Sequence, residues 1–420
     1  MSEIIPPIPV PVPSLVPSPV RGAPTWDIDP YSRDVLLNLE AWYDGLRERG
    51  PIVWLSHYGC WAIGHFEVVR EVFADWQRFG SARGVGLADF AREQPWRPPS
   101  ILLEVDPPDH DRTRKVMMRT MTPRALAGLE APMRREAEAL VERLLQRDTF
   151  DAVKDLAEAY PLKVFPDAVG LNADDREKLL IYGAMVFNAI GPDNEVRRES
   201  LANAAAVVPW ITAKCARDAL IETDLPGSGL GELIYQAVDD DEITEAEAGL
   251  LVRSLLSAGI DTTVASLGAA LKYFSENPSE WDIVRDDPTQ VRKAIEEVLR
   301  LSSPVHAFFR TASVDTEISG ITVSEGDKIM CVLGAANTDP EKWPDAARFD
   351  VTRKAAGHIA FGTGIHVCVG MAVARLEMDA MLTALAERVE RIEALEVATW
   401  RPGNSLRTLD HGRMRLIAKK

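Results

Sequence analysis

Apolar residues recur at helical spacing along most of the chain. The ranges 125–146 and 369–392 are rich in Ala, Leu, Glu and Arg, and their apolar positions fall three or four residues apart. This is the pattern of a helix with one buried face. The range 294–301 has the same helical character. We therefore expect a mainly α-helical protein.

The longest helical pattern begins at Thr244 and ends near Asn277, where the following proline disfavours helix. Thr244 and Glu247 have the spacing of a capping box, which marks a helix start. A helix of this length would span a whole domain. Its apolar pattern is interrupted in the middle by five polar residues: Ser254, Ser257, Asp261, Thr262 and Thr263. Because buried polar groups need partners, the interruption indicates a functional site.

Short strands are expected in a few places only. They are bounded by Gly, Ser and Asp, and cover 53–55, 61–63, 317–318 and 328–331. We find no internal repeat. Residues 25–420 are therefore expected to form a single domain, with one large helical part and a small β-rich portion.

Residues 1–24 stand apart because prolines follow one another closely there. Proline forbids a regular helix and favours an extended, solvated chain. We expect a flexible proline-rich leader in this range. A docking tail for another protein is the alternative.

The net charge of the chain limits the kinds of macromolecule and membrane that it is expected to bind. The chain has 47 Lys and Arg against 64 Asp and Glu, a formal net charge of −17. Such an excess argues against bulk binding of nucleic acid and against adhesion to an anionic membrane. The sequence shows neither a long apolar run nor a signal-peptide pattern, and its four cysteines have no paired spacing. We expect a cytoplasmic protein without disulfides.

One segment indicates specific chemistry. Residues 361–370 read Phe-Gly-Thr-Gly-Ile-His-Val-Cys-Val-Gly, and the glycines let the backbone approach a flat, bulky group. A helix that begins just after Cys368 would place its positive end at the sulfur and favour the thiolate, which suits ligation of haem iron. The alternative is a buried structural cysteine after a glycine turn. A c-type cytochrome is excluded because no Cys-x-x-Cys-His occurs.

This segment resembles the haem-binding signature of the cytochrome P-450 family. The resemblance implies the cytochrome P-450 fold and heme b, with Cys368 as the axial ligand of the iron. It places Phe361 over the proximal face of the haem, with Gly362 and Gly370 in the same loop. It also implies that cations and imidazoles donate to the haem propionates, namely His110, Arg114, Arg310 and His366.

A second match to the family lies in the long helix, in the run Ala258-Gly259-Ile260-Asp261-Thr262-Thr263. Glycine is unfavourable inside a helix, and here Gly259 is expected to open room for dioxygen. The resemblance implies that Thr262 hydrogen-bonds iron-bound oxygen or a water and that Asp261 relays protons from solvent. The alternative is a helix whose polar residues face outward.

A third match concerns structure rather than chemistry. Glu297 and Arg300 lie three residues apart on a predicted helix. By resemblance Arg348 joins them in a buried ionic network. Thr338 stands where the family more often has arginine, in a segment that is structural.

The substrate is suggested by two stretches, 95–100 and 253–259, which resemble a bacterial subfamily that oxidises para-substituted benzoic acids. An aromatic carboxylate that enters a dry pocket must be paired. Arg97, Ser100 and Ser254 could supply charge-assisted hydrogen bonds, whereas a substrate contact for Arg253 is left open. The resemblance implies apolar walls formed by Leu103, Phe187, Ile190, Val305 and Phe308. Relatives have an aromatic residue at the position of Ile190, so the preferred para substituent stays open.

The resulting hypothesis is a monooxygenase that hydroxylates or demethylates a small aromatic acid with dioxygen. Its electrons would come from NAD(P)H through a ferredoxin reductase and a ferredoxin. A basic patch is expected to dock the ferredoxin, formed by Arg112, Lys115, Arg119, Arg353 and Lys354. The alternatives are a peroxygenase, a monooxygenase of neutral hydrophobic substrates, and a non-enzymatic haem-thiolate sensor or electron carrier.

Overall fold

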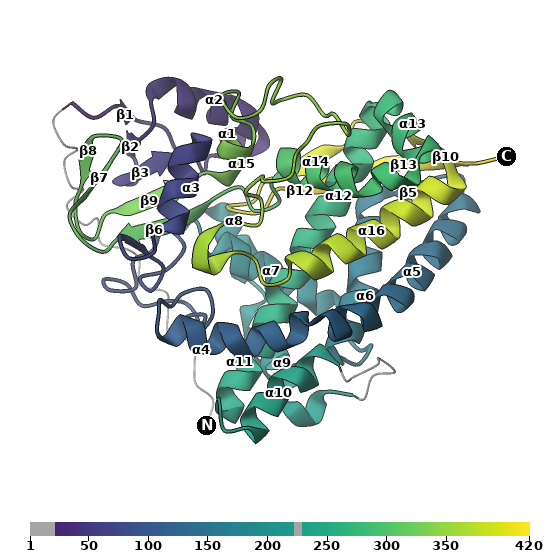
Figure 1. Cartoon of the computed structure of the whole chain (residues 1–420), viewed down its shortest axis with the longest axis horizontal. Coiled ribbons are helices and arrows are strands. Elements are labelled where there is room, and N and C mark those ends of the chain that lie inside the picture. The colour runs from purple at the N-terminus through teal and green to yellow at the C-terminus, as the bar shows by residue number, and fades with distance from the viewer. Residues whose placement is uncertain (1–21, 222–228) are drawn as a thin grey trace.

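The computed structural model describes residues 22–221 and 229–420. The leader expected at 1–24 therefore lies almost entirely outside the described residues. Helices make up most of the described chain, and the strands gather in small sheets (Figure 1). The expected mainly α fold with a small β-rich portion is confirmed.

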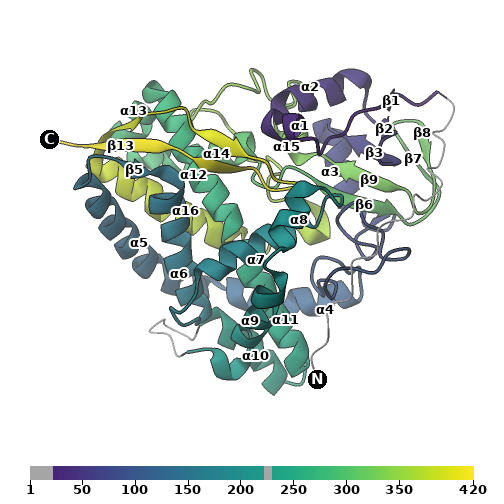
Figure 2. The same ribbon diagram turned by 180° about the vertical axis from the view of Figure 1, so that it is seen from behind.

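The helices form the larger part of the molecule (Figures 1 and 2). Those of the first half are α1 (Arg33–Leu37), α2 (Leu39–Arg49), α3 (Phe66–Ala74), α4 (Asp109–Met117), α5 (Pro123–Leu145), α6 (Ala159–Val169), α7 (Glu177–Asn188), α8 (Glu195–Leu201) and α9 (Ala204–Lys214). Those of the second half are α10 (Leu230–Asp239), α11 (Glu245–Gly259), α12 (Asp261–Glu276), α13 (Pro278–Asp286), α14 (Val291–Ser302), α15 (Leu333–Asn337) and α16 (Met371–Arg388). Helices α5 and α16 lie side by side, and α12 crosses the middle of the helical part (Figure 1).

The long helix predicted from Thr244 exists but is interrupted once. Thr244 and Glu247 form the capping box that starts α11, and the helix is distorted at Ile260, between α11 and α12, where φ is −95° and ψ is −63°. The stretch Glu245–Glu276 is long and apolar enough to cross a membrane by length and composition alone, yet most of its apolar window is buried inside the protein. It is therefore the central core helix of the fold, and the break at Ile260 falls within the predicted polar site.

A six-stranded sheet in the order β1-β2-β3-β9-β6-β4 forms the β-rich portion, beside α2, α3 and α15 (Figure 1). Its strands are β1 (Thr25–Trp26), β2 (Val53–Leu55), β3 (Cys60–Ile63), β4 (Phe79–Gly80), β6 (Phe308–Ala312) and β9 (Lys328–Cys331). The smaller sheets use β5 (Phe150–Asp151), β7 (Thr316–Ile318), β8 (Ile321–Val323), β10 (Val389–Ala394), β11 (Thr399–Arg401), β12 (Thr408–His411) and β13 (Arg413–Ala418). All four predicted strands are present, two of them one residue longer than expected.

The helix predicted over 369–392 is shorter than expected. Helix α16 ends at Arg388, and the residues that follow it form β10, which pairs antiparallel with the carboxy-terminal strand β13. The pairing is a contact between distant segments, so the local periodicity of the sequence could not show it. The first two residues of the predicted helix belong instead to the loop that carries Cys368.

The predicted ionic network is present with one different member. Glu297 and Arg300 are fully buried and joined at 2.7 Å. Arg353, rather than Arg348, is the third partner, with its Nε 3.1 Å from Glu297. The side chain of Arg348 is 65% exposed and lies 3.8 Å from Glu280. The prediction of Arg348 was therefore wrong, because a cation five residues further along the same loop reaches the buried carboxylate.

Candidate active site

A large internal cavity lies between the α11–α12 junction and the loop that carries Cys368. Its empty volume, which includes space open to solvent, is about 1860 Å³. Its lining includes most of the predicted site residues, namely Arg97, Ser100, Leu103, Arg114, Phe187, Ile190, Ser254, Thr262, Val305, Phe308, Arg310, Phe361, Gly362, His366, Cys368 and Gly370. His110 and Asp261 are not part of this lining.

The cysteine loop is held in shape by its glycines and by α3. Gly364 has a φ of +72°, and a Cβ at this position would collide with the backbone of Phe73 at the end of α3. The amide of Cys368 donates to the carbonyl of Phe361 at 2.9 Å. The loop therefore turns tightly, directs the Cys368 side chain into the cavity and leads into α16.

The electrostatics at Cys368 differ in part from the expectation. The N–H groups of Gly370 and Met371 and the guanidinium groups of Arg114 and Arg375 lower the pKa of the thiol, as expected of a helix start. Burial is the larger effect, however, and leaves the pKa above its usual value. The Cys368 side chain is accessible from the cavity, and a metal ion bound there would favour loss of the thiol proton.

Arginine and histidine side chains at the cavity could bind an anionic group. Arg310 and Arg114 line the cavity, and burial lowers the pKa of both guanidinium groups. His366 and His110 lie beside each other with ring centroids 4.5 Å apart. Among the described residues, the Nε2 atoms of both histidines are buried without a hydrogen-bond partner. Nδ1 of His110 lies 3.0 Å from the Asp111 carboxylate and therefore carries a hydrogen, so Nε2 of His110 donates only when the ring is doubly protonated. The two guanidinium groups and Nε2 of His366 fit the propionate groups of a haem, so the residues present suit the expected cofactor.

The helical side of the cavity carries the predicted hydroxyl groups. Thr262 donates to the carbonyl of Ala258 at 2.8 Å, and Ser254 donates to the carbonyl of Leu250 at 2.9 Å. A Cβ at Gly259 would lie 2.5 Å from the Phe165 ring. Close packing of Phe165 therefore requires a glycine here, and because Gly259 also lines the cavity, its expected role toward dioxygen stays a prediction.

Asp261 faces a second, smaller cavity of about 500 Å³, which Glu158 and Arg401 also line. Its Oδ2 atom is buried and finds no hydrogen-bond partner among the described residues. Burial, together with the Glu158 carboxylate, raises the pKa of Asp261 well above its usual value, and Arg401 opposes the shift. Gly183 on α7 leaves the space that this carboxyl group occupies. The acid is thus separated from the main cavity but adjoins it through Thr262.

The predicted carboxylate-binding residues meet an acid that sequence reasoning missed. Arg97 Nη1 lies 3.0 Å from Oε2 of Glu104, which also accepts the amide of Ser100 at 2.7 Å. Glu104 is buried, and Arg253 lines the same cavity. The only sequence signal was an opposite charge seven residues beyond Arg97. That signal is too weak to predict a pair across a proline-containing turn.

A second acid that sequence reasoning missed is Glu377 on α16. It lines the large cavity and is fully buried, and burial raises the pKa of its carboxyl group well above the usual value. It stands on the apolar face of α16, in helical register with Val373 and Met381. An acid among the apolar positions of a predicted helix is the sequence signal that could have identified Glu377.

The expected basic docking patch is largely neutralised. Arg112 pairs with Glu247 at 2.5 Å and Lys115 with Glu242 at 3.0 Å. Arg119 pairs with Asp240 at 2.8 Å and with Glu242 at 2.9 Å, and Arg353 is engaged by buried Glu297. Four of the five cations in the predicted patch therefore already have acidic partners, and ferredoxin docking at this patch stays a prediction. Acids on α11 and in the loop between α10 and α11 reach Arg112, Lys115 and Arg119 from a distant part of the sequence.

Comparisons with known proteins agree with this geometry. Residues 216–391 match the family model described as Cytochrome P450. The chain is 45% identical over 404 residues to "Cytochrome p450 CYP199A2" of Rhodopseudomonas palustris, covering 95% of this chain and 97% of the relative.

Two solved structures are similar over nearly the whole chain. "Structure of Cytochrome P450 CYP109Q5 from Chondromyces apiculatus" has a TM-score of 0.76 and 28% identity, covering 94% of this chain and 99% of that chain. "Cytochrome P450 CREJ in complex with (4-ethylphenyl) dihydrogen phosphate" has a TM-score of 0.79 and 25% identity, covering 89% and 96%.

Proposed function

The chain belongs to the cytochrome P450 family and is a haem-thiolate monooxygenase, and from this premise we propose that its substrate is a small aromatic carboxylic acid such as a para-substituted benzoate. One observation carries the proposal. Arg97, Ser100, Arg253 and Ser254 all line the large cavity, and the two guanidinium groups both lie near enough to Tyr182 to act on the pKa of its hydroxyl group. An acid anchored there would hold its ring against the apolar walls.

The residues that would hold the haem are those around the cysteine loop. Cys368 would ligate the iron, Phe361 would cover the proximal face, and Gly362 and Gly370 would let the backbone approach the group. The propionates would be held by Arg114, Arg310, His366 and His110. Haem bound to a cysteine thiolate supplies the activation of dioxygen for transfer of one oxygen atom.

Proton delivery would be the task of two adjacent residues on α12. Thr262 faces the main cavity and can present its hydroxyl group there. Asp261 faces the small cavity with Glu158 and Arg401. We propose that Asp261 takes up protons on that side and passes them toward Thr262. The raised pKa of Asp261 fits a carboxyl group that holds a proton before delivery.

The proposed substrate chemistry balances with one dioxygen. A para-methoxybenzoate would combine with O₂, two electrons and two protons to give para-hydroxybenzoate, formaldehyde and water. The anchored carboxylate would direct the para substituent away from the cations, so demethylation or para-alkyl hydroxylation follows from geometry. The similar CREJ structure holds (4-ethylphenyl) dihydrogen phosphate, an anionic aromatic molecule with a para alkyl group. That ligand supports the proposed class.

Electrons reach proteins of this family from separate redox partner proteins. We propose a ferredoxin for this role, reduced by a ferredoxin reductase with NAD(P)H as the ultimate donor. The cations near the cysteine loop are paired with acids. Long-range electrostatic attraction would therefore contribute less to docking than it would with an unpaired basic patch.

A neutral hydrophobic substrate is the second candidate, because Glu104 already neutralises Arg97. Titration of the haem-loaded protein, followed by its Soret shift, separates the two. The proposal expects para-methoxybenzoic acid to bind more tightly than its methyl ester. Arg97→Ala should weaken binding of the acid by about ten- to a hundredfold, the equivalent of roughly 1.5–3 kcal/mol. Equal affinity for acid and ester would favour the neutral class.

A further inference from the structure

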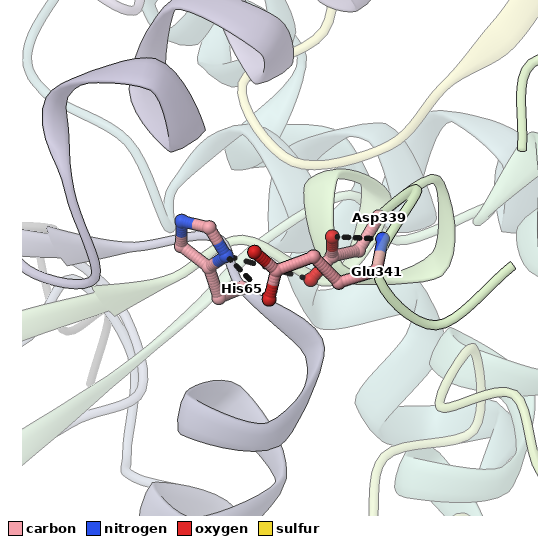
Figure 3. Close-up of side chains that lie close together, drawn as sticks. All are labelled: His65, Asp339 and Glu341. Atoms are coloured by element: carbon pink, nitrogen blue, oxygen red, sulfur yellow. Dashed lines mark hydrogen bonds and ion pairs between the residues drawn. The ribbon is translucent and has the colours of Figure 1, made fainter.

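Three ligand-type side chains converge away from the proposed active site, at the amino-terminal end of α3. His65 precedes α3, while Asp339 and Glu341 follow α15 (Figure 3). Nδ1 of His65 lies 3.6 Å from Oδ2 of Asp339 and 3.9 Å from Oε2 of Glu341. All three atoms lie within 4.8 Å of one another.

The other ring nitrogen of His65 fixes how this cluster can be protonated. Nε2 lies 3.2 Å from the carbonyl oxygen of Arg47. Because a carbonyl can only accept, Nε2 carries the hydrogen. The neutral imidazole therefore presents the lone pair of Nδ1 to two carboxylates. Three acceptors that face one another are stable only with a cation among them, which is either a proton on Nδ1 or a metal ion.

We propose that His65, Asp339 and Glu341 bind a divalent transition-metal ion of the zinc class. Zinc ions are bound by imidazole nitrogen and carboxylate oxygen atoms, and three protein ligands leave a fourth position open. Adjacent ligands of a tetrahedral zinc ion lie about 3.3 Å apart, given metal–ligand distances of about 2.0–2.1 Å. The observed separations, which are all within 4.8 Å, require a closing movement of at most about 1.5 Å.

The surroundings of the cluster support binding of a metal. A histidine ligand commonly donates its second N–H to a backbone carbonyl, as His65 does to Arg47. Asp339 is only 3% exposed and is fixed by the amides of Phe66 at 2.8 Å and Glu341 at 3.0 Å. Glu341 is 81% exposed and can move toward an ion. Two ligands are thus preorganised and the third is adjustable.

A bound ion would join α3 to the segment after α15. The opposite end of α3 carries Phe73, which lines the large cavity and packs against the cysteine loop at Gly364. The ion would therefore stabilise an element that supports the haem loop, without touching the reacting atoms. Binding to the folded state alone raises the free energy of unfolding.

The test is a calorimetric titration of the haem-loaded, chelator-treated full chain with Zn²⁺ at pH 8, where protons compete least. One saturable site is expected, together with a rise in the unfolding temperature. His65→Gln and Glu341→Gln should each weaken the binding by at least about tenfold. Glu341 is exposed, so its variant is expected to fold normally.

His411→Gln is the matched control. His411 also has two carboxylates nearby, but Glu396 lies 3.9 Å from Nε2 and Asp410 lies 3.5 Å from Nδ1. These atoms are on different sides of the ring and cannot share one ion, so this variant should bind Zn²⁺ like the wild type. Absence of a saturable site, or equal binding by the wild type and both cluster variants, would overturn the proposal. The cluster would then hold a proton only.

Discussion

Arg97 and Glu104 form an ion pair inside the large cavity, with Nη1 and Oε2 3.0 Å apart. The cation that we expect to anchor a substrate carboxylate therefore already has a carboxylate partner. Glu104 cannot turn away freely, because it also accepts the amide of Ser100. A substrate acid must share Arg97 with Glu104, and Arg253 lines the same cavity, as do Arg114 and Arg310.

The Glu104→Gln variant tests this competition. Glutamine can still accept the Ser100 amide but carries no charge, so Arg97 becomes fully available to a substrate. Hydrogen bonds to charged groups contribute about 1.5–3 kcal/mol, and we expect an aromatic acid to bind several-fold more tightly. Affinity for the matching methyl ester should not change. If the acid bound more weakly to this variant, Glu104 would be assisting the binding of the acid rather than competing with it.

The Thr262→Ala variant tests the proposed role of the hydroxyl group in the cavity. Among the described residues, the threonine side chain donates to the carbonyl of Ala258 alone, so its removal should leave the fold and substrate binding intact. Proton delivery should fail, and reducing equivalents should be diverted to hydrogen peroxide. Thr262→Ser should keep most of the coupling. Measurement of product and peroxide per NAD(P)H decides the point, and wild-type coupling in the alanine variant would contradict the role.

The Asp261→Asn variant tests the buried acid through stability. Burial raises the pKa of Asp261, so the folded state holds this proton more tightly than the unfolded state. The contribution to stability is complete below the unfolded pKa of about 4 and is lost as the pH rises through the folded pKa. Asparagine does not titrate, so its stability advantage over wild type should grow with pH, by at most about 1.4 kcal/mol per unit.

Urea unfolding of Asp261→Asn and wild type at a series of pH values provides this measurement. Substrate turnover by Asp261→Asn should also fall. A pH-independent difference in stability between Asp261→Asn and wild type would show that the carboxyl group has an ordinary pKa.

The Arg353→Ala variant tests the corrected ionic network. Arg353 is a partner of the fully buried Glu297, and loss of one partner from a buried pair costs about 3–5 kcal/mol. Arg348→Ala is the matched control, because its exposed side chain should contribute less than about 0.5 kcal/mol. Denaturant unfolding compares the two. Similar losses for both variants would restore Arg348 as a member of the network.

The sequence was sufficient to identify candidate site residues that lie close together along the chain. The glycines around Cys368 and the polar run at Asp261 and Thr262 are contiguous, so their patterns survive in the linear chain. The structure places Cys368 and Thr262 on the lining of one cavity, as the resemblance implied.

The sequence was insufficient where a partner comes from a distant segment. Glu158, Asp261 and Arg401 meet across three separate elements, and β10 exists because it pairs with β13. The paired cations Arg112 and Lys115 appeared free in the sequence because their acids lie more than a hundred residues further along the chain. Periodicity and spacing contain no information about such contacts.

The most direct test of the proposed function is product analysis with para-methoxybenzoic acid and its methyl ester. The haem-loaded protein, supplied with a ferredoxin, a ferredoxin reductase and NAD(P)H, is incubated with each compound, and formaldehyde is measured. The account predicts para-hydroxybenzoic acid and formaldehyde in equal amounts from the acid, and little product from the ester. Equal turnover of the two compounds, or turnover of the ester alone, would contradict it.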